Sequence, residues 1–132
     1  MTITHMLFGI EGRIRRSEYW ACILASGGAF FVAILLVGFI ANQVGELSDA
    51  MKVANGIFWL VVFGAYQWIS ICVQAKRCHD RDKSGWFQLI GFIPFIGGIW
   101  LLIELGFLDG TQGENRFGPS PKGISNVSDA FA

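Results

Sequence analysis

The residues most capable of chemistry lie in one short segment, residues 76–83, which reads Lys-Arg-Cys-His-Asp-Arg-Asp-Lys. His79 and Asp80 could form a proton-accepting pair, with Asp82 as a second carboxylate, because an imidazole beside an anion titrates near neutral pH. The competing interpretation is structural: the charges neutralise one another while His79 braces the turn, as in many ion-pair networks. We give the structural interpretation more weight and assign no catalytic residue.

No metal or cofactor site is predicted. Cys78, His79 and Asp80 offer ligand types, but consecutive residues rarely converge on one ion, and structural zinc needs four ligands at paired spacings. The other two of the three cysteines lie in apolar segments, so a disulfide is not expected. The glycine-rich residues 110–121 lack the Lys-Ser/Thr of a phosphate loop and are typical of a chain of tight turns.

The composition of the whole chain is that of a membrane protein. Of its 132 residues, 53% are hydrophobic and only 15% are charged, whereas about a quarter of residues are charged in soluble domains. The mean hydropathy is +0.51. The net charge is zero, so the composition gives no support to nucleic-acid binding.

Three apolar blocks surround the charged segment. The first, residues 20–41, holds 22 residues without a charge, and such a helix would be about 33 Å long, enough to cross a bilayer. A secretory signal peptide is the rival interpretation, but the apolar run is too long and no clear cleavage site follows it. With further spans at about 52–74 and 86–108, we predict an all-α membrane protein, a small helical bundle of three transmembrane segments.

The third block is broken at Pro94 and Gly97. Proline removes a backbone donor and clashes with the preceding turn, so a kink or a full break is expected. Two shapes fit: one kinked span, or a re-entrant hairpin whose first limb, at about 12 Å, could enter the bilayer but not cross it. We favour the kinked span. Glu104, the acid of this block, is expected to reach the surface, and Arg116 would be its natural partner if the tail folds back.

Lys and Arg counts near the ends of the spans predict the orientation. Three arginines precede the first span and four cations lie in the charged segment, whereas Lys52 alone lies between the first two spans. This places the N-terminus and the charged segment in the cytoplasm. The predicted organisation is a cytoplasmic basic arm (residues 1–19), a transmembrane helical domain (residues 20–109) and a Gly/Pro-rich tail with a disordered end (residues 110–132).

Four motifs occur in a recognisable order. Residues 12–20 read Gly-Arg-Ile-Arg-Arg-Ser-Glu-Tyr-Trp, residues 77–86 carry Arg-x-His-Asp and then Ser-x-Trp, and residues 94–97 and 110–121 supply Pro-x-x-Gly and a closing signature. Together they resemble a bacterial inner-membrane family known as domain of unknown function 805. The resemblance covers about residues 8–122, with minor departures at Ile10 and Cys78. It implies a small multi-pass protein of the bacterial inner membrane and supplies no catalytic residues.

The candidate functional residues form one polar set: Arg13, Arg16, Glu18, Arg77, His79, Asp80, Asp82, Asn115 and Arg116. The prediction is a non-catalytic module that binds partner proteins or anionic lipid headgroups, to which each surface cation contributes about 1 kcal/mol. The alternative is an oligomeric small transporter or channel subunit, and the third is a lipid-acting enzyme that uses His79 and Asp80. Expected partners are membrane lipids, together with a second copy or another membrane protein, and no nucleic acid.

Overall fold

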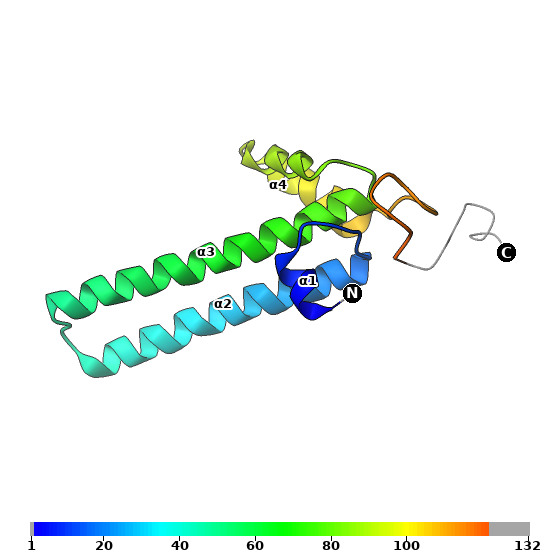
Figure 1. The fold of residues 1–132 in the computed structure, drawn as a ribbon. Coiled ribbons are helices and arrows are strands. Elements are labelled where there is room, and N and C mark those ends of the chain that lie inside the picture. Colours follow the sequence, from blue (N-terminus) through cyan, green and yellow to red (C-terminus); the bar gives the residue numbers. More distant parts are fainter. Residues whose placement is uncertain (1, 122–132) are drawn as a thin grey trace.

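Two long antiparallel helices, α2 (Arg16–Val44) and α3 (Asp49–Asp80), form the body of the protein (Figure 1). The structure is a computed structural model and describes residues 2–121; the end of the tail, predicted to be disordered, lies outside them. The other elements gather at the C-terminal end of α3. They are α1 (Ile3–Phe8), the 3-10 helix η1 (Gly85–Phe92), α4 (Ile96–Leu101) and the π-helix η2 (Leu102–Phe107).

Each long helix begins at a polar cap. The Glu18 carboxylate accepts a hydrogen bond from the backbone N–H of Arg15, 2.9 Å away, at the start of α2. The Ser48 hydroxyl accepts one from the N–H of Met51 at the start of α3. With 29 and 32 residues, α2 and α3 would measure about 44 and 48 Å. Within the described part of the chain, these two helices are long and apolar enough to cross a membrane.

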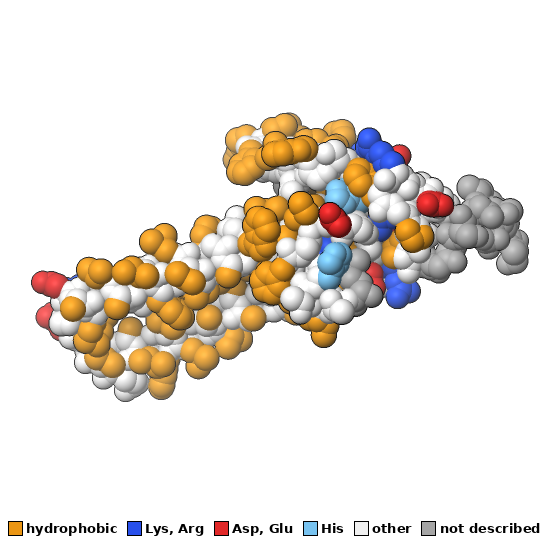
Figure 2. All heavy atoms as spheres, viewed as in Figure 1, with side chains coloured by type: hydrophobic (Ala, Val, Ile, Leu, Met, Phe, Trp, Pro, Cys, Tyr) orange, Lys and Arg blue, Asp and Glu red, His pale blue; other side chains and the backbone are white. Residues whose placement is uncertain are grey.

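Hydrophobic side chains cover the outside of the long helices and of the third apolar block, whereas charged side chains gather where α3 ends, with a smaller group at the turn between α2 and α3 (Figure 2). The most apolar stretch of α2 buries none of its residues within the protein. In water such a surface would be strongly unfavourable, and in a bilayer it faces lipid of the same polarity. The exposed apolar surface is therefore typical of a membrane protein.

The basic arm contains a short helix, α1, which the sequence did not indicate. Side chains from one face of α3 donate hydrogen bonds to its last carbonyl groups. The Lys76 ammonium donates to the carbonyls of His5 and Met6, and the indole N–H of Trp68 and the thiol of Cys72 both donate to the carbonyl of Phe8. Because Trp68, Cys72 and Lys76 are spaced four apart, they share a helix face and hold α1 along it.

The third apolar block folds into a hairpin and is not the kinked span that the sequence favoured. The break predicted at Pro94 and Gly97 is present, because η1 ends at Phe92 and α4 begins at Ile96. Between them, Phe95 has a left-handed φ of 64°, and 91% of the residue is exposed. The two long helices of the predicted three-segment bundle are therefore present, and the third segment, broken at Pro94 and Gly97 as predicted, folds as a short hairpin.

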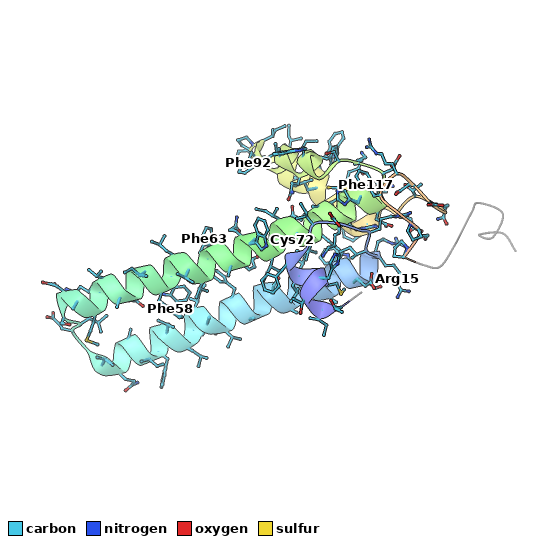
Figure 3. All side chains as sticks on the ribbon, viewed as in Figure 1. Arg15, Phe58, Phe63, Cys72, Phe92 and Phe117 are labelled. Carbon is cyan, nitrogen blue, oxygen red and sulfur yellow. The ribbon has the colours of Figure 1, made fainter. Side chains whose placement is uncertain are left out.

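The two limbs of the hairpin touch at glycines. A Cβ at Gly97 would overlap the carbonyl oxygen of Ile90, and one at Gly91 would lie 2.7 Å from Cδ1 of Leu101. These glycines allow the limbs to approach closely, as small residues do between helices in membranes. The chain thus returns to the end of α3 from which η1 started, and Figure 3 shows Phe92 at the far tip of the hairpin.

We expect Gly97→Ala to destabilise the hairpin by about 1–3 kcal/mol, because the added methyl group overlaps the opposite limb. Thermal unfolding of the purified protein in mild detergent measures the change. Gly98→Ala is the matched control, since a Cβ at Gly98 meets nothing within 4 Å. Equal unfolding temperatures for the two variants would contradict the close contact at Gly97.

Candidate functional site

The last turns of α3 present Arg77 and Asp80 to the interior, three residues apart on one helix face. The Arg77 guanidinium is fully buried and donates through Nη1 to Oδ2 of Asp80. Its Nε donates to the carbonyl of Leu105 at 2.6 Å, and its Nη2 donates to the carbonyl of Leu108. One side chain thereby ties the end of α3 to the returning limb of the third block.

Arg13 approaches the same carboxylate from the segment between α1 and α2. Its Nε and Nη2 atoms each lie 3.1 Å from Oδ1 of Asp80, and only 4% of the residue is exposed. Its remaining N–H groups donate to tail carbonyls, at 2.6 Å for Thr111, 2.7 Å for Gly113 and 3.1 Å for Gly118. Arg13 therefore holds the tail residues against the end of α3.

Asp80 is the centre of this arrangement, with a guanidinium on each carboxylate oxygen. The tail also packs directly on it. The backbone N–H of Thr111 donates to the Asp80 carbonyl at 2.7 Å, and a Cβ at Gly110 would overlap the Asp80 carboxylate. Glycine at position 110 is thus required by the close approach of the tail.

His79 and Asn115 form a second layer beside the ion cluster. The imidazole Nδ1 of His79 lies 3.1 Å from the Gly12 carbonyl, and its ring stacks on Phe117 with centroids 4.1 Å apart and planes 8° apart. The Asn115 side chain donates to the His79 carbonyl at 2.9 Å. Both Phe117 and Arg15 lie at this end of the molecule in Figure 3, so the arm, the charged segment and the tail meet there.

The remaining predicted site residues lie at the rim of this cluster. Arg116 pairs with Asp82 at 3.2 Å, and both side chains are largely exposed. Arg16 donates to the Phe107 carbonyl at 2.9 Å, and Glu18 caps α2. Of the nine candidates, the structure thus joins Arg13, Arg77, His79, Asp80 and Asn115 in one interior network.

Glu104 has different partners from the one expected. Arg81 donates to its Oε2 at 2.9 and 3.1 Å, and Lys83 donates to its Oε1 at 3.2 Å. The expected pairing with Arg116 is wrong, because the hairpin returns Glu104 to the charged segment itself. One usable signal for this pairing is present in the sequence, a lone acid in an apolar block close to a group of cations.

Lys76 was also overlooked. It is fully buried, and its hydrogen bonds to carbonyls of α1 replace the carboxylate partner that a buried cation usually has. The partners of this lysine are backbone oxygens, so no acidic residue in the sequence marks it as buried. Its position one helical turn beyond Cys72 is the one indication that it faces α1.

The geometry of the network leaves little room for a substrate. Within residues 2–121, no buried side-chain nitrogen or oxygen lacks a hydrogen-bond partner. The cavity beside Asp80, which Asp109 and Thr111 also line, has a volume of about 10 Å³, about that of a single water probe. The described residues also contain no group of three or more His, Cys, Asp or Glu placed to hold a metal ion. The cluster thus has the properties of a packed interior.

Comparison with known proteins places these contacts in a family. A family model described as "Protein of unknown function (DUF805)" matches residues 7–119, which include every residue of the network. The chain belongs to the DUF805 family. It is 38% identical over 116 residues to "Inner membrane protein YhaH" of Escherichia coli K12, covering 86% of this chain and 88% of that protein.

Two further relatives from the same organism cover almost the same length. "Inner membrane protein YhaI" is 35% identical over 120 residues, covering 89% of this chain and 90% of that protein. "Uncharacterized protein YiiR" is 29% identical over 153 aligned positions, covering 98% and 97%. No solved structure matches the chain. The family and the names of its members agree with the apolar surface of α2 and α3.

We expect Asp80→Asn to lower the free energy of unfolding by about 3–5 kcal/mol, because it leaves two buried guanidinium groups without their carboxylate. Thermal unfolding in detergent again measures the change. Asp82→Asn is the matched control: its ion pair is exposed, and such pairs contribute about 0–1 kcal/mol. If Asp80→Asn kept the wild-type unfolding temperature yet abolished a cellular phenotype, the structural role of the cluster would be refuted.

Proposed function

We propose that this protein is a non-catalytic module of the bacterial inner membrane that binds anionic lipid headgroups at its cytoplasmic end. The observation that carries the proposal is the division of its cations into two groups. Arg13, Lys76 and Arg77 are buried, and their N–H groups donate hydrogen bonds to oxygen atoms of the protein itself. The arginines that remain accessible lie around them, at the end where α2 begins and α3 finishes.

Three arginines form this accessible set, which we call the cationic rim. Their side chains are 48% exposed for Arg15, 45% for Arg16 and 62% for Arg116. Their carboxylate partners lie at 3.2–3.9 Å and are themselves accessible, and such surface pairs are weak and easily exchanged. A phosphate of an anionic lipid can therefore replace them, with bidentate geometry that suits a guanidinium.

The proposed topology has two spans, α2 and α3, and a re-entrant hairpin that enters the cytoplasmic leaflet. The first limb of the hairpin begins at the charged segment and the second limb ends beside it, and the tail is bound there by Arg13. The arm, the charged segment and the tail would then lie on one side, with Lys52 alone among the cations of the described residues on the other. This distribution satisfies the positive-inside rule.

A protein partner in the membrane, or a second copy, is the other occupant that this module could bind. The alanines at positions 21, 25 and 29 form a small-residue ridge on α2 and are exposed in the structure. Such ridges allow close helix contacts in lipid. An oligomeric transporter would need this contact to enclose a path, so cross-linking in native membranes that gave only monomers would exclude it.

The topology predicts the side on which reporters are found. A reporter fused after Ala132 should show cytoplasmic activity, and one inserted at Gly45, between α2 and α3, should show periplasmic activity. Alkaline phosphatase and green fluorescent protein fusions in intact cells provide the two readouts. A periplasmic signal after Ala132 would overturn the re-entrant hairpin and favour a third full span.

The cationic rim predicts a preference for anionic lipid. In Arg15→Gln/Arg16→Gln, the association constant for phosphatidylglycerol relative to phosphatidylcholine should fall roughly fivefold or more, because each surface cation contributes about 1 kcal/mol. Spin-labelled lipids and the protein in vesicles supply the measurement, and rising salt should weaken the preference of the wild type.

Lys52→Gln is the control for the lipid measurement, since it removes an exposed cation at the opposite end of the two long helices. It should leave the preference unchanged in vesicles whose anionic lipid is confined to the cytoplasmic leaflet. A wild-type protein with no preference for phosphatidylglycerol would refute the proposed function.

A further inference from the structure

A groove with a volume of about 620 Å³ separates α3 from the hairpin. Its size lies within the range of small-molecule sites. Its walls carry hydrocarbon side chains such as Leu89, Phe92 and Leu101, and no charged residue is among the residues that line it. The groove is therefore distinct from the ion cluster and from the cationic rim.

The groove also contains a row of polar side chains without partners. Gln67, Ser70 and Gln74 lie at spacings of three and four along α3, which places them on one face, and Gln88 joins them from η1. Within residues 2–121, none of these four side chains makes a hydrogen bond to the protein. In an apolar medium, a polar group left in this condition is costly.

Tyr19 supplies an independent observation on the same wall. Its side chain is buried, with 7% of the residue exposed, and the residue lines the groove. Its hydroxyl makes no hydrogen bond to the described residues, and since no buried side-chain oxygen there lacks a partner, the hydroxyl oxygen is itself accessible, whereas a Tyr hydroxyl in an interior usually has a partner. A ligand in the groove would provide it.

We propose that the groove binds one uncharged lipid of the diacylglycerol class. The glutamine amides, the Ser70 hydroxyl and the Tyr19 hydroxyl both donate and accept, so they match a head that carries hydroxyl and ester groups. The apolar walls match acyl chains. A phosphate would lie here without a cation, and a quinone would offer acceptors alone. The site goes beyond the proposed function and does not depend on the cationic rim.

Retention of lipid by the purified full-length protein tests this site. The protein is placed in phosphatidylcholine nanodiscs with equal small amounts of dioleoylglycerol, phosphatidylglycerol and ubiquinone, and the lipid that stays bound is identified by native mass spectrometry. Dioleoylglycerol should be retained above the other two. In Gln74→Leu/Gln88→Leu its retention should fall about tenfold, because each hydrogen bond lost in a membrane costs roughly threefold.

Two matched controls and a second variant make the result decisive. Gln43→Leu makes the same change on α2 outside the groove and should retain dioleoylglycerol as the wild type does. Gly98→Leu fills the groove, where a Cβ meets nothing within 4 Å, and should displace the lipid even if the glutamine variant fails to fold. Gly28→Leu, equally unobstructed, is its control.

Three outcomes would overturn the site: equal retention in the wild type and Gly98→Leu, a preference for phosphatidylglycerol, or a preference for ubiquinone. The second outcome would leave the cationic rim as the lipid-binding surface. A wild-type protein without a preference for phosphatidylglycerol, with dioleoylglycerol still bound, would instead refute the proposed function and preserve the groove. The two proposals therefore fail separately.

Discussion

The carboxylate of Asp80, held between Arg13 and Arg77, is the interaction on which the rest of the structure depends. Removing three charges from water is costly, and one carboxylate cannot neutralise two guanidinium groups. The remaining donors are satisfied by backbone carbonyls of the hairpin and the tail. A buried arginine presents five N–H groups in a fixed fork, so it can gather several chain segments at once.

This constraint explains why segments far apart in the sequence meet at one end of α3. The apolar faces of α2 and the hairpin can be accommodated by lipid in many relative positions, so they specify the arrangement only weakly. Hydrogen bonds from a buried guanidinium are directional and are lost if the partner moves. The arm, the returning limb and the tail are consequently held by polar contacts, while the long helices supply the membrane-facing surface.

The same division separates the two proposed roles of the surface. Cations that are engaged inside cannot contact a headgroup, so the proposed attraction to anionic lipid rests on the cationic rim alone. The groove between α3 and the hairpin has polar groups but no charged residue in its lining. Its chemistry therefore suits an uncharged lipid head. The two proposals thus concern surfaces of different polarity on one small protein.

The residue types predicted which residues belong to the site, but they did not predict which of these residues contact one another. Residues of the arm, the charged segment and the tail form the polar set that the sequence predicts, and the structure joins five of its nine members in one network. The pairing of Glu104 with Arg81 and Lys83 was missed because it requires knowing that the block forms a hairpin. The role of Lys76 was missed because its partners are carbonyls of α1, and every residue has a carbonyl.

The sequence by itself determined the class of protein, the positions of its two long helices and the break at Pro94. These follow from local properties: runs of apolar residues long enough for a bilayer, cations beside them, and a proline that cannot continue a helix. Only the tertiary structure decided that the third block turns back and that Asp80 lies between two arginines. Those outcomes depend on contacts between distant segments, and the close approach at Gly97 and Gly110 is visible only when the chain is folded.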